Sequence, residues 1–160
     1  MKKTAIALAV ASVLASPAFA ASFVNGGFED GTTNGWTTAG TFYRNSYDNT
    51  ALTTALVLGS GSVDTHSAVI GTSYVDPRVG AALGTTVYSG AKAYRVEDTT
   101  TGGYASVISQ TVNNYTDANI FFAWKAVLLG AHGTSDAATM KITLRDNTAG
   151  ADVITRTYNA

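Results

Sequence analysis

Residues 139–158 read TMKITLRDNTAGADVITRTY, and this stretch sets the fold class. Apolar side chains alternate with polar ones, so that Met140, Ile142 and Leu144 would share one face of an extended segment. A period of two residues is typical of a β-strand with one buried face. The polar sequence DNTAG then turns the chain into a second strand, predicted over residues 152–158. The stretch therefore predicts two consecutive strands and an antiparallel all-β fold.

Similar segments precede these two strands and are separated by turns rich in Gly, Asn and Asp. No segment after residue 20 shows a helical period. We predict further strands over residues 23–28, 36–44, 52–58, 67–74, 91–96, 104–112 and 120–129. The sequence EDTTTGG between two of these strands predicts a hairpin over residues 91–112. The segment 120–129 is apolar on both faces, so we expect it to form a central, buried strand.

Together these strands predict an antiparallel β-sandwich, with one domain over residues 21–160. Its expected core residues are Phe28, Trp36, Ile108, Phe122, Trp124, Ile142 and Leu144. The sequence stops directly after the strand 152–158, which would leave an open edge there. We therefore expect the domain to be incomplete, with further strands beyond this sequence.

The first twenty residues predict an export signal. Lys2 and Lys3 form a positively charged start, and residues 4–14 form an apolar run that is too short to span a bilayer. The sequence Ala-Phe-Ala ending at Ala20 predicts cleavage between Ala20 and Ala21. The stretch resembles a Gram-negative Sec signal, with an uncleaved anchor helix as the alternative. The predicted location is secreted or at the cell surface, with the periplasm as a further option.

Charge and cysteine content limit the classes of partner. All 11 acidic residues lie after residue 20, while Lys2 and Lys3 would be removed, so the exported chain is mildly acidic. Nucleic acids and anionic membranes favour basic surfaces, so neither is an expected partner. The chain has no cysteine, which excludes disulfides and a lipid-anchored cysteine. No apolar run after the signal is long enough for a membrane span.

Several motifs carry a family resemblance. The sequence NGGFEDG at residues 25–31, followed by Gly35-Trp36, resembles the opening of secreted galactose-binding-like jelly rolls, including family 4-type carbohydrate-binding modules. Residues 92–98 and 104–112, which end in ISQTV, resemble the middle hairpin of these domains, and residues 120–126 resemble the core strand that follows. The combination is similar to bacterial exoproteins with a PEP-CTERM sorting tail, although this sequence contains no such tail.

The resemblance implies a calcium site as one option. In calcium-binding members of this fold, a carboxylate at the position of Glu29 joins backbone carbonyls and an acidic residue of the last strand. Ca²⁺ takes six to eight oxygen ligands. The last-strand partner is absent from this sequence, so a structural calcium ion at Glu29 competes with a plain solvated turn. Glu97 and Asp98 are similarly interpreted as a solvated turn rather than a metal site.

Aromatic side chains are the candidates for ligand contact. A flat aromatic face can pack against the CH groups of a sugar ring as it does against other apolar surfaces. Trp36 and Trp124 are expected in the core, because burial of a tryptophan removes a large apolar area from water. We predict instead that exposed tyrosines bind the ligand, and the candidates are Tyr43, Tyr47, Tyr74 and Tyr88.

Residues for catalysis are scarce. His66 and His132 are the only histidines, and each could form half of a hydrolytic or metal site. The sequence contains no Gly-x-Ser-x-Gly or His-Glu-x-x-His motif. We therefore predict a non-catalytic module that binds polysaccharide or an extracellular matrix or surface component. The alternatives are a structural or adhesive exoprotein and, third, a secreted hydrolase.

Overall fold

The computed structural model of the protein describes residues 22–130, 133 and 135–160. These residues form six strands, one short α-helix and one 3-10 helix, so the chain belongs to the all-β class. Within the same ranges, no helix has the length and apolar character needed to cross a membrane. The predicted signal peptide, with its cleavage site at Ala20 and Ala21, lies outside the described residues.

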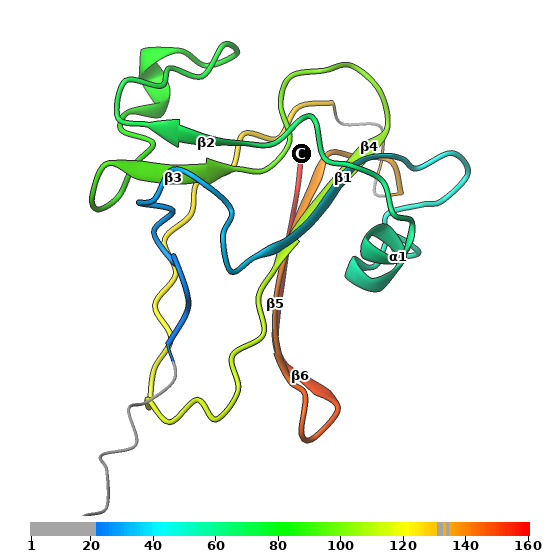
Figure 1. Ribbon diagram of the computed structural model, residues 1–160. Coiled ribbons are helices and arrows are strands. Elements are labelled where there is room, and N and C mark those ends of the chain that lie inside the picture. The colour runs from blue at the N-terminus through cyan, green and yellow to red at the C-terminus, as the bar shows by residue number, and fades with distance from the viewer. Residues whose placement is uncertain (1–21, 131–132, 134) are drawn as a thin grey trace, which may run out of the picture.

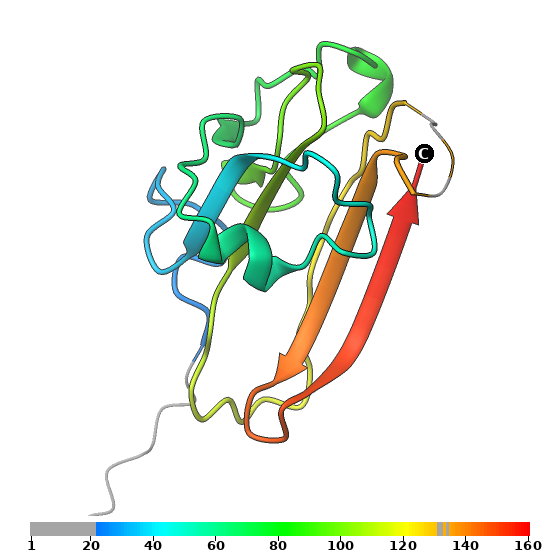
Figure 2. The ribbon, with the colours of Figure 1, turned by 90° about the vertical axis from the view of Figure 1, so that its right-hand side faces the viewer.

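The six strands pair as three antiparallel two-stranded sheets (Figure 1). The pairs are β1 (Thr37–Tyr43) with β4 (Tyr104–Ser109), β2 (Ala68–Gly71) with β3 (Lys92–Arg95), and β5 (Thr139–Asp146) with β6 (Ala151–Asn159). Figure 2 shows the long β5–β6 hairpin standing to one side of β1 and β4. The hairpin predicted over residues 91–112 is wrong, because β3 pairs with β2 and β4 pairs with β1.

The β5–β6 hairpin confirms the alternation found in the sequence. Met140, Ile142 and Leu144 are half-buried, while the residues between them are exposed. The ladder shifts its register between Leu144 and Arg145, beside the turn. Arg145 and Asp152 then face each other across the two strands, with 2.9 Å between Nη1 and Oδ1. Period-two patterning therefore located the first strand of this hairpin, and the DNTAG turn located the second.

The apolar run 52–58 forms a helix rather than the predicted strand. The helix α1 (Thr54–Gly59) begins after Thr53, whose Oγ1 accepts a hydrogen bond from the backbone N–H of Leu56 at 3.1 Å. Such a side-chain cap satisfies one of the free N–H groups at a helix start. The helix packs against β1 and β4 and buries Val57. A short apolar run does not distinguish a strand from a buried helical turn, which explains the error.

A row of aromatic rings forms the centre of packing at the N-terminal side. Phe28 stacks on Trp36, with ring centroids 5.3 Å apart, and on Tyr94 of β3, at 5.2 Å. Phe23 stacks on the other side of Trp36 at 6.2 Å. Residues 23–28 form turns rather than the predicted first strand, and the backbone N–H of Phe28 bonds to the carbonyl of Asn25. In place of a strand ladder, these rings and two hydrogen bonds between the Gln110 side chain and the backbone of Val24 hold this segment.

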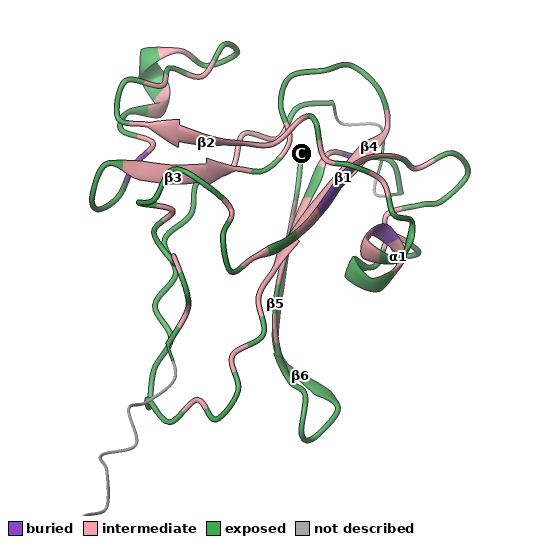
Figure 3. Ribbon diagram, in the orientation of Figure 1, coloured by how far each residue is buried: buried purple, intermediate pink, exposed green. Residues whose placement is uncertain are grey.

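Fully buried apolar residues are few among the described residues (Figure 3). They are Ala39, Val57, Val87 and Ala137. Of the predicted core residues, Phe28, Trp36, Ile108, Ile142 and Leu144 are half-buried. The packing is therefore distributed over many half-exposed side chains.

The prediction of a central, buried strand over residues 120–129 is wrong. The segment has no strand partner among the described residues, and Phe122 and Trp124 are 64% and 42% exposed. Trp124 is covered in part by Tyr158 of β6, whose ring centroid lies 4.4 Å away. Apolar composition favours burial, but burial in a sheet also requires strands on which the segment can pair.

Candidate functional site

Two of the four predicted ligand tyrosines lie together at the end of β1. Tyr43 and Tyr47 are 60% and 41% exposed and line one open groove of about 540 Å³ between this strand and α1. The groove is lined by Phe42, Tyr43, Asn45, Tyr47, Ala55, Leu56, Gly59 and Ser60. The arrangement combines aromatic faces with amide and hydroxyl groups on a solvent-accessible surface.

Arg44 fixes the loop that carries these tyrosines. Its Nε donates to the carbonyl of Tyr47 at 2.8 Å, and the N–H of Tyr47 donates to the carbonyl of Arg44 at 2.8 Å. The guanidinium also bonds Oδ1 of Asn49 at 3.1 Å and forms an ion pair with Asp136 at 2.5 Å. Although the loop is exposed, its backbone is therefore held at several points.

The other two tyrosines lie away from this groove. The Arg95 guanidinium lies over the ring of Tyr74, 5.6 Å from its centroid, and Nη1 donates to the Tyr74 hydroxyl at 3.4 Å. Tyr88 is 88% exposed and is not among the residues that line the groove. The structure therefore brings Tyr43 and Tyr47 together but leaves Tyr74 and Tyr88 apart from them.

The side chain of Glu29 reaches the start of β3. Its carboxylate accepts hydrogen bonds from the backbone N–H of Ala91 at 3.0 and 3.1 Å and from that of Lys92 at 3.1 Å. Gly90 permits this approach, because a side chain there would overlap with the carboxylate. Each described contact of Glu29 is with an N–H donor, and none supplies the oxygen ligands that Ca²⁺ requires. Calcium at Glu29 stays a prediction.

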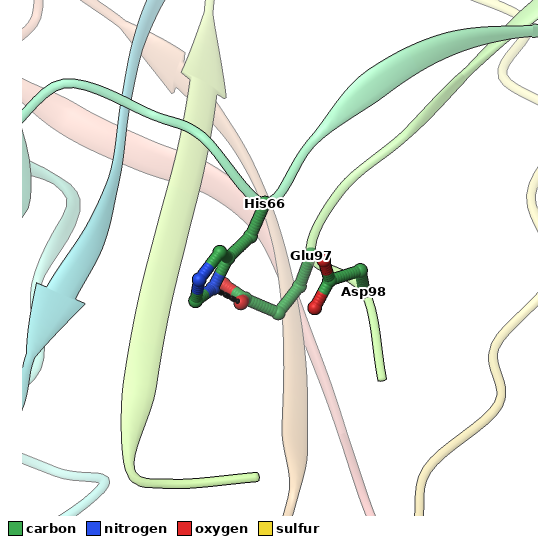
Figure 4. Close-up of side chains that lie close together, drawn as sticks. All are labelled: His66, Glu97 and Asp98. Atoms are coloured by element: carbon green, nitrogen blue, oxygen red, sulfur yellow. Dashed lines mark hydrogen bonds and ion pairs between the residues drawn. The ribbon is translucent and has the colours of Figure 1, made fainter. Parts of the chain in front are cut away.

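A second group of side chains brings together two segments that lie far apart in the sequence. His66, Glu97 and Asp98 offer ligand atoms that all lie within 4.8 Å of one another (Figure 4). The β2–β3 ladder pairs Ala68 with Arg95, and the same register continued by two residues places His66 opposite Glu97. The Nδ1 of His66 lies 2.5 Å from Oε1 of Glu97.

Hydrogen bonds from neighbouring strands orient Glu97. Its Oε2 accepts from the hydroxyl of Ser106 in β4 at 2.6 Å, and its N–H donates to the hydroxyl of Ser67 at 3.0 Å. Glu97 has a φ of 64°, in the left-handed region that few side chains adopt. Such a conformation persists only where its surroundings enforce it, and it is common at functional sites.

A bulge in β1 lies beside this group. The β1–β4 register shifts between Ala39 and Phe42, and the N–H of Thr41 donates to the hydroxyl of Ser106 at 3.3 Å. A side chain at Gly40 would overlap with Ser106 and with Asp64. β-Bulges often re-aim side chains near functional sites. Here the bulge makes room for Asp64 next to the group.

Asp64 joins the segment before β2 to β3 and β4. Its Oδ1 accepts from the N–H groups of His66 at 3.1 Å and Ser67 at 3.0 Å, and from the Ser106 hydroxyl at 3.4 Å. The Tyr94 hydroxyl lies 3.5 Å from Oδ2, and burial together with the Asp64 charge raises the pKa of Tyr94. The carboxylate of Asp64 thereby fixes the position of His66.

Charges and hydrogen bonds also act on Asp98. Burial works to raise the pKa of this carboxyl, but hydrogen bonds from Thr100 and the nearby charges of His66 and Arg95 outweigh burial, so the pKa is lowered. The N–H of Thr100 donates to Oδ1 at 2.7 Å. Asp98 is therefore a carboxylate at neutral pH.

The arrangement differs from a serine–histidine–acid triad. In such a triad the histidine accepts the proton of the serine hydroxyl. Here the Ser106 hydroxyl donates to Glu97, and Glu97 lies between Ser106 and His66. No described hydrogen bond joins the Ser106 hydroxyl to the imidazole of His66, as such a triad requires. The group instead presents an imidazole nitrogen and two carboxylates toward a common point.

Comparison with models of known protein families, with curated proteins and with solved structures found no match to the chain.

Proposed function

We propose that the protein is an exported, non-catalytic module that binds polysaccharide or another component of the extracellular matrix through the groove beside β1. The observation that carries this proposal is the convergence of the exposed side chains of Tyr43 and Tyr47 on one open surface. Exposed apolar surface that is contiguous, rather than scattered singly, often marks an interaction site.

The groove has the chemistry that a sugar chain requires. The faces of Tyr43 and Tyr47 offer apolar surface for the CH groups of a sugar ring. Asn45 and Ser60 add groups that both donate and accept hydrogen bonds, as sugar hydroxyls do. Because Arg44 already fixes the loop, less conformational freedom is lost on binding.

The proposed architecture behind the groove is an antiparallel jelly-roll sandwich. It is supported by the antiparallel pairing of all three sheets and by the resemblance of residues 25–36 to the opening of galactose-binding-like domains. Export is supported by the signal-like residues 1–20. The proposed non-catalytic role is supported by the sequence, which contains no Gly-x-Ser-x-Gly or His-Glu-x-x-His motif.

Affinity electrophoresis through gels that contain neutral polysaccharides tests the proposal. We expect at least one polysaccharide to retard the protein, and Tyr43→Ala or Tyr47→Ala to weaken this retardation about tenfold, equivalent to about 1.4 kcal/mol. Tyr88→Ala is the matched control, since Tyr88 is equally aromatic and more exposed but lies outside the groove.

The outcomes separate the competing functions. Retardation that is reduced by Tyr88→Ala as much as by Tyr43→Ala would contradict the groove. The lack of retardation by any polysaccharide would favour a structural or adhesive exoprotein. Release of shortened sugars during the assay would favour a hydrolase.

A further inference from the structure

We propose that His66, Glu97 and Asp98 bind one divalent transition-metal ion of the Zn²⁺ type. The ligand atoms of the three side chains lie within 4.8 Å of one another, and all three side chains meet at the exit of the β2–β3 ladder (Figure 4). This inference is independent of sugar binding, because none of the three residues lines the groove beside β1.

The ligand types select the class of ion. One imidazole nitrogen and two carboxylates suit Zn²⁺ and similar first-row ions, which accept nitrogen and oxygen ligands. Ca²⁺ and Mg²⁺ prefer oxygen ligands only. Three protein ligands would leave a fourth position to water, the usual pattern where a zinc site is not closed by four side chains.

The geometry requires only a small adjustment. Zinc–nitrogen and zinc–oxygen bonds of about 2.0–2.2 Å around a tetrahedral ion place neighbouring ligand atoms about 3.3 Å apart. His66 Nδ1 and Glu97 Oε1 are 2.5 Å apart, so they would separate by less than about 1 Å. Asp98 is exposed and follows Glu97 directly, so its carboxylate can close on the ion through a side-chain rotation.

The surroundings of these ligands resemble the support that metal ligands receive elsewhere. Ser106 holds the second oxygen of Glu97 at 2.6 Å, and the ring of Tyr104 packs edge-on against His66 at 4.9 Å. Hydrogen bonds of this kind orient the ligands of a metal. The nearby Asp64 adds a third carboxylate, so a cation would reduce repulsion among these carboxylates.

An ion here would connect two segments of the chain. His66 precedes β2, Glu97 and Asp98 follow β3, and Ser106 connects Glu97 to β4. The ion would therefore hold the segment before β2 against the segment after β3, and Zn²⁺ should raise the melting temperature.

Titration of the untagged protein with Zn²⁺, followed by calorimetry and by competition with a chromophoric chelator, tests the site. We expect one ion per chain, with affinity reduced about tenfold or more by His66→Gln, Glu97→Gln or Asp98→Asn. His132→Gln is the matched histidine control and should bind as the unmodified protein does. Excess Ca²⁺ should leave the bound Zn²⁺ in place.

Two further measurements guard against an effect on folding alone. Asp98→Asn alters an exposed side chain, so its circular dichroism should match that of the unmodified protein while its Zn²⁺ affinity falls. Substitution by Co²⁺ should give a visible absorption spectrum that disappears in His66→Gln. Unchanged affinity in Asp98→Asn and His66→Gln, loss of binding in His132→Gln, displacement by Ca²⁺, or no binding at all would each overturn the proposal.

Discussion

Replacement of Asp64 by alanine should be among the most destabilising single changes outside the apolar core. Its Oδ1 accepts the backbone N–H groups of His66 and Ser67 at 3.1 and 3.0 Å, in a half-buried position. A hydrogen bond to a charged group contributes about 1.5–3 kcal/mol to stability. The contacts with Ser106 and Tyr94, at 3.4 and 3.5 Å, are too long to add much.

Two such bonds give an upper limit of about 6 kcal/mol, and water can replace part of each because the site is not fully buried. We therefore expect Asp64→Ala to lower the free energy of unfolding by about 2–4 kcal/mol, a large share of the 5–15 kcal/mol that is typical of a domain. Urea unfolding followed by tryptophan fluorescence measures this difference.

Asp64→Asn provides the matched control. The asparagine amide keeps one oxygen that can accept both N–H groups but removes the charge. The free energy of unfolding should therefore fall less in Asp64→Asn than in Asp64→Ala. A loss below about 0.5 kcal/mol in Asp64→Ala, the size expected for a neutral surface change, would refute the structural role assigned to this carboxylate.

Two further predictions concern exposed loops. Thr53→Ala removes the hydroxyl that accepts the N–H of Leu56 and should lower the free energy of unfolding by about 1 kcal/mol, measured with urea. Thr53→Ser keeps the hydroxyl and should keep most of the stability. Equal losses in both variants would contradict a capping role. Hydrogen bonds from the hydroxyl and N–H of Thr50 and from the N–H of Ala51 lower the pKa of Asp48. The contribution of the Asp48 carboxylate to folding stability is therefore present at neutral pH and is lost as the pH falls below about 4. Asp48→Asn should therefore make the loss of stability between about pH 5 and 2 less steep, and an unchanged slope in pH-dependent unfolding would contradict this assignment.

Sequence patterns located the strands better than their partners. The alternation of Met140, Ile142 and Leu144 led to β5, and turn residues marked the limits of most other strands. The hairpin over residues 91–112 was wrong because consecutive strands pair often but not always. The prediction of a buried strand over residues 120–129 was wrong, because an apolar pattern indicates a preference for burial. It does not indicate which strands could pair with the segment.

The candidate sites were only partly predictable for the same reason. Tyr43 and Tyr47 lie close in the sequence and were predicted from residue type, and the structure places both at one groove. His66 and Glu97 were each noted but dismissed, since their proximity depends on the register of the β2–β3 ladder. The register itself could have signalled the contact, because residues at equal distances beyond a paired end lie opposite one another.

The spacing of these contacts along the chain also sets an expected order of assembly. Arg145 and Asp152 are separated by 7 positions, His66 and Glu97 by 31, and Thr41 and Ser106 by 65. Closing the longest of these loops costs about 2 kcal/mol more chain entropy than closing the shortest. We expect the β5–β6 hairpin to form within about 1–10 μs, β2 to find β3 next, and β1 to find β4 last. The contact between His66 and Glu97 would then mark the middle stage of folding, and its time of appearance would report when non-local pairing begins.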